Sequence, residues 1–431
     1  MTPKSLRLRT YQVGFGDCFL LSVDYRDSPS RHVLIDFGST KLPPNAPADW
    51  MQKVANDIAQ QCDNKLTAVI ATHRHRDHIS GFATNGRRST GKVIAQLKPD
   101  LVLQPWTENP ALPPDAEEAA IPTAEKGMAA HQASLSAMHR VSQHILAESA
   151  RNHNYLRALE DSPRDQIDFL GDDNLQNRSA VVNLMTMGAA REYLSAGMAT
   201  ALDGLLPGVE VEVLGPPTVA QSDAVKKQRS RDPNEFWQLQ ASAFAALEPA
   251  ERGRVKPLFP DYVRERIDGL FPMDTRWLIY HARHLRGRQM LQIVRMLDRA
   301  MNNTSLILLF RAQGKSLLFP GDAQIENWSY ALSQPDVRRR LAEVDLYKVG
   351  HHGSLNATPR SLWGAFKKKS KNDSKTRLLT VASTLAGKHG SVDAHTEVPR
   401  QTLVTELKRE SNFFSTQSLG PALFHDTTIN L

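Results

Sequence analysis

The stretch HRHRDH at residues 73–78 is the most informative part of this sequence. It places three histidines and one aspartate within six residues, directly after the apolar run at residues 68–71. That run is typical of a buried strand, and neither helical nor strand amphipathicity explains the polar cluster that follows it. Residues two apart at a strand end point the same way, so His73 and His75 can bind one metal ion together.

The second half of the motif extends the predicted metal site. Asp77 and His78 lie one step further into the turn and can reach a second ion near the first. Neutral imidazole and carboxylate groups suit Zn²⁺, and they suit Mn²⁺ or Fe²⁺ as well. We therefore expect a site for two divalent metal ions, with zinc as the first choice.

Further ligands must come from elsewhere in the chain, and polar groups follow later predicted strands. Asp322 ends an apolar run, where Gly321 lets the backbone turn and the carboxylate project from the strand end. The predicted strand at residues 345–349 is followed by two histidines between glycines, His351 and His352. Either histidine is suited to bind a metal ion, and the residues alone leave the choice open.

Two more histidines come near the end of the chain. His389 and His395 follow a predicted strand that ends at Ala382, and either could complete the ligands of the second ion. Asp17 and Asp36 lie in turn sequences at strand ends. We expect these two carboxylates to form turns or to orient imidazole rings rather than to bind metal.

The order of predicted elements indicates an α/β (α+β) protein. A helix is predicted over residues 49–61. Residues 85–205 and 220–300 keep helical periods, so they are predicted as mostly helical insertions within a single domain that spans residues 1–431. Short runs with the pattern of strands lie at residues 6–11, 19–23, 33–35, 68–71, 209–214, 305–310, 316–319, 345–349 and 378–382.

Composition indicates a globular protein of the cytoplasm. Of the 431 residues 41% are hydrophobic and 23% are charged, and no apolar tract is long enough to span a bilayer, so no membrane partner is expected. The N-terminal residues lack the apolar segment of a signal peptide. Cys18 and Cys62 are too few for a disulfide framework, which favours a reducing compartment.

The net charge of +7 favours an anionic partner. Basic residues are concentrated at residues 226–231, 281–288, 338–340 and 367–371. Each of these basic runs is either an ordinary solvated face or part of a surface that binds polyphosphate or nucleic acid.

The order of the motifs resembles the metallo-β-lactamase superfamily, above all the branch of ComEC-type competence proteins and phosphorylcholine esterases. The similarity covers residues 6–84, 209–217 and 302–400. It implies an αββα sandwich with two metal ions at one edge of the sheets. The motifs that carry it are VGFGD at 13–17, LIDFG at 34–38, HRHRDH at 73–78, NNTSL at 302–306, FPGD at 319–322 and HHGS at 351–354.

The resemblance also implies which residues bind each ion. His395 is preferred to His389 because an acidic and an apolar residue and then a predicted helix follow it, although threonine stands where the family usually has proline. His352 is preferred as ligand, with His351 facing the substrate. The implied ligands are His73, His75 and His352 for the first ion, Asp77, His78 and His395 for the second, and Asp322 between the two.

The implied activity is that of a hydrolase using a metal-bridging hydroxide. Asp77 would orient this nucleophile or take its proton, and His351 and Ser354 would stabilise the developing oxyanion. The expected substrate is an anionic phosphodiester, such as a nucleic acid or nucleotide, which would make the protein a nuclease or phosphodiesterase. The alternatives are hydrolysis of a lactone, thioester or β-lactam, and a non-enzymatic binding module stabilised by metal. The sequence predicts no oligomeric state.

Overall fold

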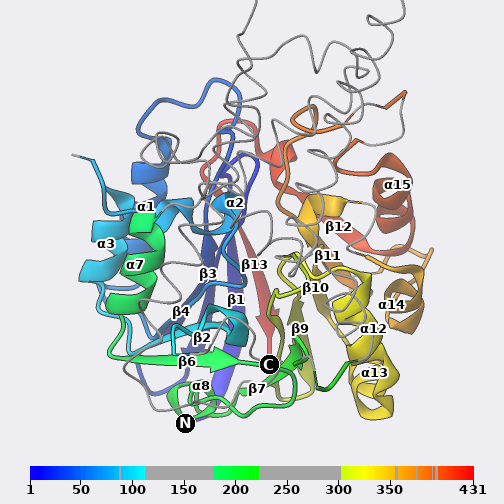
Figure 1. Ribbon diagram of the computed structural model, residues 1–431. Coiled ribbons are helices and arrows are strands. Elements are labelled where there is room, and N and C mark those ends of the chain that lie inside the picture. Colours follow the sequence, from blue (N-terminus) through cyan, green and yellow to red (C-terminus); the bar gives the residue numbers. More distant parts are fainter. Residues whose placement is uncertain are drawn as a thin grey trace, which may run out of the picture. The chain divides into compact units, whose positions relative to one another are not determined.

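The computed structural model describes residues 1–86, 89–111, 178–218, 220–222, 302–354, 358–374, 376–390, 392–393 and 397–431. These residues belong to one compact unit, made of residues 1–131, 176–226 and 298–431. Two β-sheets and the helices beside them form this unit (Figure 1). None of the helices in the described ranges combines the length and the apolar character that crossing a bilayer requires.

The first sheet has seven strands in the order β13-β1-β2-β3-β4-β5-β6. Its strands from β13 to β3 pair antiparallel, and those from β3 to β6 pair parallel. The bounds are β1 Pro3–Tyr11, β2 Cys18–Tyr25, β3 Arg31–Phe37, β4 Ala68–Ile70, β5 Leu101–Pro105, β6 Ala190–Leu194 and β13 Phe424–Asn430.

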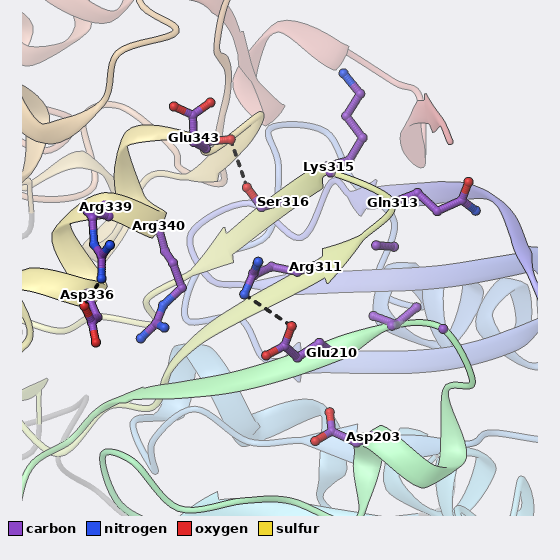
Figure 2. A pocket seen from close by; sticks show the side chains of 14 residues that line it. Asp203, Glu210, Arg311, Gln313, Lys315, Ser316, Asp336, Arg339, Arg340 and Glu343 are labelled. Carbon is purple, nitrogen blue, oxygen red and sulfur yellow. Dashed lines mark hydrogen bonds and ion pairs between the residues drawn. The ribbon is translucent and has the colours of Figure 1, made fainter.

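The second sheet has six strands in the order β12-β11-β10-β9-β8-β7. Its strands from β7 to β9 pair antiparallel, and those from β9 to β12 pair parallel. The bounds are β7 Glu210–Gly215, β8 Ile307–Ala312, β9 Lys315–Phe319, β10 Leu346–Lys348, β11 Leu379–Ala382 and β12 Asn412–Ser415. The turn between β8 and β9 lines a pocket of about 900 Å³ (Figure 2).

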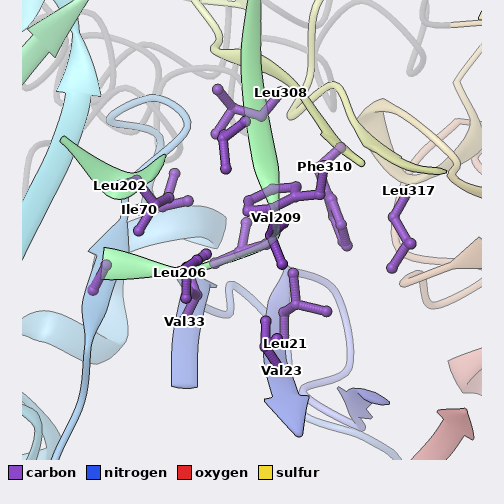
Figure 3. Close-up of a cluster of buried hydrophobic side chains, with 14 of the residues drawn as sticks. Leu21, Val23, Val33, Ile70, Leu202, Leu206, Val209, Leu308, Phe310 and Leu317 are labelled. Carbon is purple, nitrogen blue, oxygen red and sulfur yellow. The ribbon is translucent and has the colours of Figure 1, made fainter. Parts of the chain in front are cut away.

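The two sheets pack face to face through one apolar core (Figure 3). In β8, Leu308 and Phe310 point into this core, whereas Ile307 and Leu309 belong to the cluster on the other face of the sheet. This alternation is expected of a strand that is buried on both faces. From the first sheet the core receives the fully buried side chains of Leu21, Val23, Val33 and Ile70.

Helices cover the outer face of each sheet (Figure 1). Beside the first sheet lie α1 Trp50–Gln61, α3 Thr90–Gln96 and α7 Arg178–Thr186. Beside the second lie α12 Ile325–Ser333, α13 Pro335–Ala342, α14 Arg360–Ala365 and α15 Gln401–Glu410, with Trp328 fully buried in their shared cluster. Short helical turns are α2 Arg76–Ile79, α8 Leu202–Leu205, and those at Ser80–Phe82, Trp106–Glu108, His351–Gly353 and Thr416–Leu419.

The prediction of a mixed α/β protein is confirmed, and so are the strands and the helix predicted from local pattern. Within the range 85–205, the described parts supply β5 and β6 to the first sheet as well as the helices α3, α7 and α8. Strand β5 is a five-residue run in which Gln104 stands among apolar residues, and periodicity alone does not distinguish so short a run from a buried helical segment. The middle of this range and residues 223–301 lie outside the described residues.

Candidate metal centre

Three loops bring the predicted ligands to one edge of the sheets. The HRHRDH motif follows β4, Asp322 follows β9, and the histidine pair follows β10. The segment before β8 contacts both of the first two loops. The N–H of Leu306 donates to the carbonyl of Thr72 over 2.9 Å, and the N–H of Asp322 donates to the hydroxyl of Ser305 over 3.2 Å. Polar groups at the carboxyl ends of strands are the usual location of a binding site in α/β sheets.

One group of possible ligands consists of His73, His75 and Asp77. One donor atom from each lies within 4.8 Å of the others, and all three side chains are buried. Nε2 of His73 lies 3.0 Å from Nδ1 of His75. Burial, together with the nearby His78 and His75, lowers the pKa of His73 well below its ordinary value, and burial lowers the pKa of His75 to about 4. Both rings are therefore neutral near pH 7, as metal ligation requires.

A second group shares Asp77 with the first and adds His78, Asp322 and His352, with donor atoms again within 4.8 Å of one another. Nε2 of His78 lies 3.2 Å from Oδ2 of Asp322, and Nε2 of His352 lies 2.8 Å from Oδ2 of Asp77. Because the two groups share a carboxylate, they are adjacent.

The carboxylates of this cluster are ionised. Burial acts to raise the pKa of Asp77, but the charge of His78 and the hydrogen bond from His352 outweigh it and hold the pKa below its ordinary value. The same balance holds the pKa of Asp322 well below its ordinary value, where burial is outweighed by the charges of His78 and His351.

Several polar atoms of the cluster are left without a hydrogen bond. Among the described residues, four buried atoms have no hydrogen-bond partner: His75 Nε2, Asp77 Oδ1, His78 Nε2 and Asp322 Oδ2. Buried polar atoms in folded proteins are nearly always paired, so four exceptions in one place need a cause. A bound cation would supply it, and these buried histidine and aspartate groups could hold a metal ion.

Asp36 lies behind the ligands, near the end of β3. It accepts hydrogen bonds from the N–H and the hydroxyl of Thr72, each at 2.7 Å, and Nδ1 of His78 lies 2.8 Å from its Oδ2. This contact agrees with the prediction that Asp36 orients an imidazole ring.

Lys348, at the end of β10, was not predicted as part of the site. It is 2% exposed and forms an ion pair with Asp17, which is fully buried. Burial acts to lower the pKa of Lys348, but Asp17 and Asp322 outweigh it and raise the pKa above its ordinary value. The sequence held one signal for this role, a lysine at the end of a buried strand. Because lysine is almost never fully buried without a partner, a lysine there indicates a buried carboxylate nearby.

The two histidines after β10 have different surroundings. His352 is fully buried, and its Nδ1 lies 2.9 Å from the carbonyl of Ser383. The His351 side chain is 21% exposed, its Nδ1 lies 2.8 Å from the hydroxyl of Ser354, and it belongs to neither group of possible ligands. This geometry favours His352 as a ligand and leaves His351 and Ser354 at the rim.

The position of His352 differs from the implied ligand assignment. The resemblance pairs it with His73 and His75, whereas its ring lies against Asp77 and belongs to the group that contains His78. The physical reason is the contact with Ser383, which fixes Nδ1 and directs Nε2 towards Asp77.

The described residues do not decide whether His389 or His395 is the ligand expected near the end of the sequence. His389 is buried against the ring of Phe15, which in turn contacts His352, each with 4.4 Å between ring centroids. Burial lowers the pKa of His389 to about 2. His395, the preferred ligand, lies outside the described residues, so its role stays a prediction.

The basic run at residues 338–340 does not form a free cationic surface. It lines part of the pocket in Figure 2, at the opposite end of β9 from the metal centre. Arg339 pairs with Asp336, and Arg340 pairs with Glu212 at 2.7 Å. Arg311 in the same pocket also pairs with Glu212 at 2.7 Å. Two of the three arginines of this run are therefore paired with acidic neighbours, and the third, Arg338, donates to the carbonyl of Leu332.

No protein-family model matches the chain, and no curated protein matches it significantly. The described residues themselves establish a buried cluster of histidines and aspartates that could hold a metal ion.

Proposed function

We propose that this protein is a metal-dependent hydrolase of the metallo-β-lactamase superfamily, that it binds two divalent metal ions, and that it cleaves phosphodiesters. The observation that carries this proposal is the pair of adjacent His/Asp groups that share Asp77. Two neighbouring groups joined by one carboxylate suit two cations close together. The helix, sheet, sheet, helix order of the layers agrees with the αββα sandwich of that superfamily.

The donor atoms fit transition-metal ions. The first group would hold one ion through His73, His75 and Asp77, and the second would hold another through His78, Asp322 and His352 together with Asp77. Imidazole nitrogens and carboxylate oxygens are ordinary ligands of Zn²⁺, and they also bind Mn²⁺ and Fe²⁺. The unpartnered buried atoms of these side chains support this use.

When bound, the two cations would supply a water of lowered pKa as nucleophile and would polarise an oxygen of the substrate. Side chains of the protein would accept the proton of the attacking water and stabilise the negative charge that develops on the substrate. Oδ1 of Asp77, which has no hydrogen-bond partner among the described residues, can orient the attacking water or accept its proton. When the hydroxyl of Ser354 donates to Nδ1 of His351, Nε2 carries the ring proton and can donate to the oxygen that gains negative charge.

The choice of substrate rests on charge. The net charge of +7 favours an anionic substrate, which a phosphodiester supplies. Two of the basic runs, 226–231 and 281–288, lie outside the described residues. Because Arg339 and Arg340 are paired with acidic residues, the run at residues 338–340 gives no support to a long polyanion as substrate. Hydrolysis of a carbonyl substrate is therefore kept as the second candidate function.

Metal content tests the proposal first. We expect close to two transition-metal ions per chain in wild-type protein purified without added metal, and a sharp fall in Asp77→Ala, because Asp77 belongs to both groups. Asp373→Ala is the control, since that side chain is 91% exposed. Plasma mass spectrometry gives the counts. Wild-type protein that holds no metal, and takes up none on incubation with Zn²⁺, Mn²⁺ or Fe²⁺, would refute the proposal.

Substrate class is tested on the metal-loaded protein. We expect turnover of bis(p-nitrophenyl) phosphate that is lost in Asp77→Ala and kept in Asp373→Ala. Turnover of a lactone or thioester in its place would identify the second candidate.

A further inference from the structure

Lys348 is a buried cation directly beneath the metal centre. Its Nζ forms an ion pair with Asp17, donates a hydrogen bond to the carbonyl of Gly321 over 3.1 Å, and lies 3.6 Å from Oδ1 of Asp322. The side chains of Lys348, Asp17 and Asp322 are all 2% exposed or less. Charges at this depth persist only when they are paired, so the arrangement is specific.

The two oxygens of Asp322 have different surroundings. Oδ1 accepts a hydrogen bond from the backbone N–H of His351 over 2.9 Å and faces Lys348. Oδ2 has no hydrogen-bond partner among the described residues, and it lies 3.2 Å from Nε2 of His78 and 3.7 Å from Nε2 of His352. One oxygen is therefore held at the back of the site, and the other is presented to the possible metal ligands.

The different surroundings of the two oxygens affect how many metal ions the Asp322 carboxylate can bind. A carboxylate binds a cation through one oxygen or through both. With Oδ1 held by Lys348 and the His351 N–H, Asp322 offers Oδ2 alone, and a single oxygen between two neighbouring groups can be shared by two ions. Without the lysine, the N–H of His351 alone holds Oδ1, and Asp322 can turn more easily to offer both oxygens to one ion.

We infer that Lys348 is a positioning residue that holds Oδ1 of Asp322 away from the metal centre and thereby makes the site bind two metal ions rather than one. The inference rests on the proposed function, because it concerns the same centre. Lys348 acts through Asp322 and has no contact with the substrate in this role.

The variants must separate positioning from folding. Lys348→Met removes the charge and keeps the length of the side chain, but it leaves the Asp17 carboxylate buried without a cation and can prevent folding. The double variant Asp17→Asn/Lys348→Met removes both charges of the pair, a change that folded proteins tolerate far better. Asp17→Asn alone is the matched control, since it loses the same carboxylate and keeps Lys348.

The measurement is calorimetric titration of metal-free protein with Zn²⁺, together with the visible spectrum during titration with Co²⁺. We expect wild type and Asp17→Asn to bind two ions. In the double variant we expect the first ion to bind as before and the second to bind about 10- to 100-fold more weakly, the range usual when a group that orients a ligand is lost. The Co²⁺ spectrum should match wild type at one equivalent and differ at two.

The possible results are distinct. If Lys348 acts only through its charge, removing it makes both ions bind more tightly, and that result would overturn the inference. Two ions bound with wild-type affinity by the double variant would overturn it as well. Wild-type protein that binds no Zn²⁺ would refute the proposed function itself, and the inference with it.

Discussion

Nδ1 of His78 lies 2.8 Å from Oδ2 of Asp36, and neither side chain is more than 2% exposed. Asp36 is fixed in turn by the N–H and the hydroxyl of Thr72, so the carboxylate cannot rotate without breaking two further hydrogen bonds. The ring of His78 is thereby held with Nε2 towards Asp322. A carboxylate behind a histidine in this way fixes the tautomer and the orientation of a metal ligand.

The first prediction concerns this contact. Asp36→Asn keeps the shape of the side chain and removes its charge, so we expect the affinity for Zn²⁺ to fall about 10- to 100-fold while the protein stays folded. Calorimetric titration of metal-free protein measures the change. Asp27→Asn, at an exposed position after β2, is the control and should bind Zn²⁺ as wild type does. Equal affinity of Asp36→Asn and wild type would contradict this role of Asp36.

The second prediction concerns the close approach of two loops. A Cβ added at Gly38 would lie 2.4 Å from the backbone carbon and oxygen of Asp77, so Gly38→Ala must displace the residue shared by both ligand groups. We expect Gly38→Ala to lose most of its bound metal. Gly364→Ala in α14 meets no atom within 4 Å and should stabilise the protein by up to about 1 kcal/mol, the usual difference in helix propensity. Metal analysis and urea unfolding test both, and normal metal content in Gly38→Ala would contradict the prediction.

The third prediction compares two arginines. Arg9 is 7% exposed and bonds Asp57 at 2.8 Å and both oxygens of Asp426 at 2.8 and 2.7 Å, which ties β1 to α1 and β13. Arg9→Met leaves two carboxylates without their cation, so we expect a loss of about 3 kcal/mol in the free energy of unfolding.

Arg339 provides the comparison. This side chain is 80% exposed and its partner Asp336 is 66% exposed, so Arg339→Met should leave the free energy of unfolding close to that of wild type. Urea unfolding measures both variants. Similar losses at the two positions would show that burial does not decide the contribution of these ion pairs.

The fourth prediction concerns the two cysteines. Burial raises the pKa of the Cys62 thiol to about 12 and raises that of Cys18 well above its ordinary value. The thiolate is the reactive form, and at pH 8 a pKa of about 12 leaves about one Cys62 thiol in ten thousand ionised. We expect iodoacetamide to leave the native protein unlabelled at pH 8 and to label both cysteines in urea. Rapid labelling of the native protein would contradict this assignment.

The sequence predicts those parts of the metal centre in which a polar motif directly follows an apolar strand. Asp322 and the two histidines follow β9 and β10, which pair in parallel, so their proximity at one sheet edge could be expected. The HRHRDH motif follows β4 in the other sheet, so its approach to Asp322 depends on how the two sheets pack. Strand β5 was missed because its five residues carry no period that separates strand from helix.

Other features depend on contacts between residues far apart in the chain. The choice of His352 over His351 follows from the carbonyl of Ser383, 31 residues away. The role of Lys348 depends on its ion pair with Asp17. Lys348 ends β10 of the second sheet, whereas Asp17 directly precedes β2 of the first sheet. No local pattern specifies such pairings, because each partner looks unremarkable in its own sequence neighbourhood.

Strand β13 pairs with β1 from Ser5 opposite Asn430 to Tyr11 opposite Phe424, and the N–H of Leu431 bonds the carbonyl of Lys4 over 3.0 Å. A chain is made from its N-terminal side, so β1 leaves the ribosome early and lacks this neighbour until β13 has been synthesised. Closure of that side of the sheet is thus a late, long-range event, of the kind that makes folding slow. Until then the open edge of β1 can pair with other chains, so the growing protein is prone to aggregation until β13 is available.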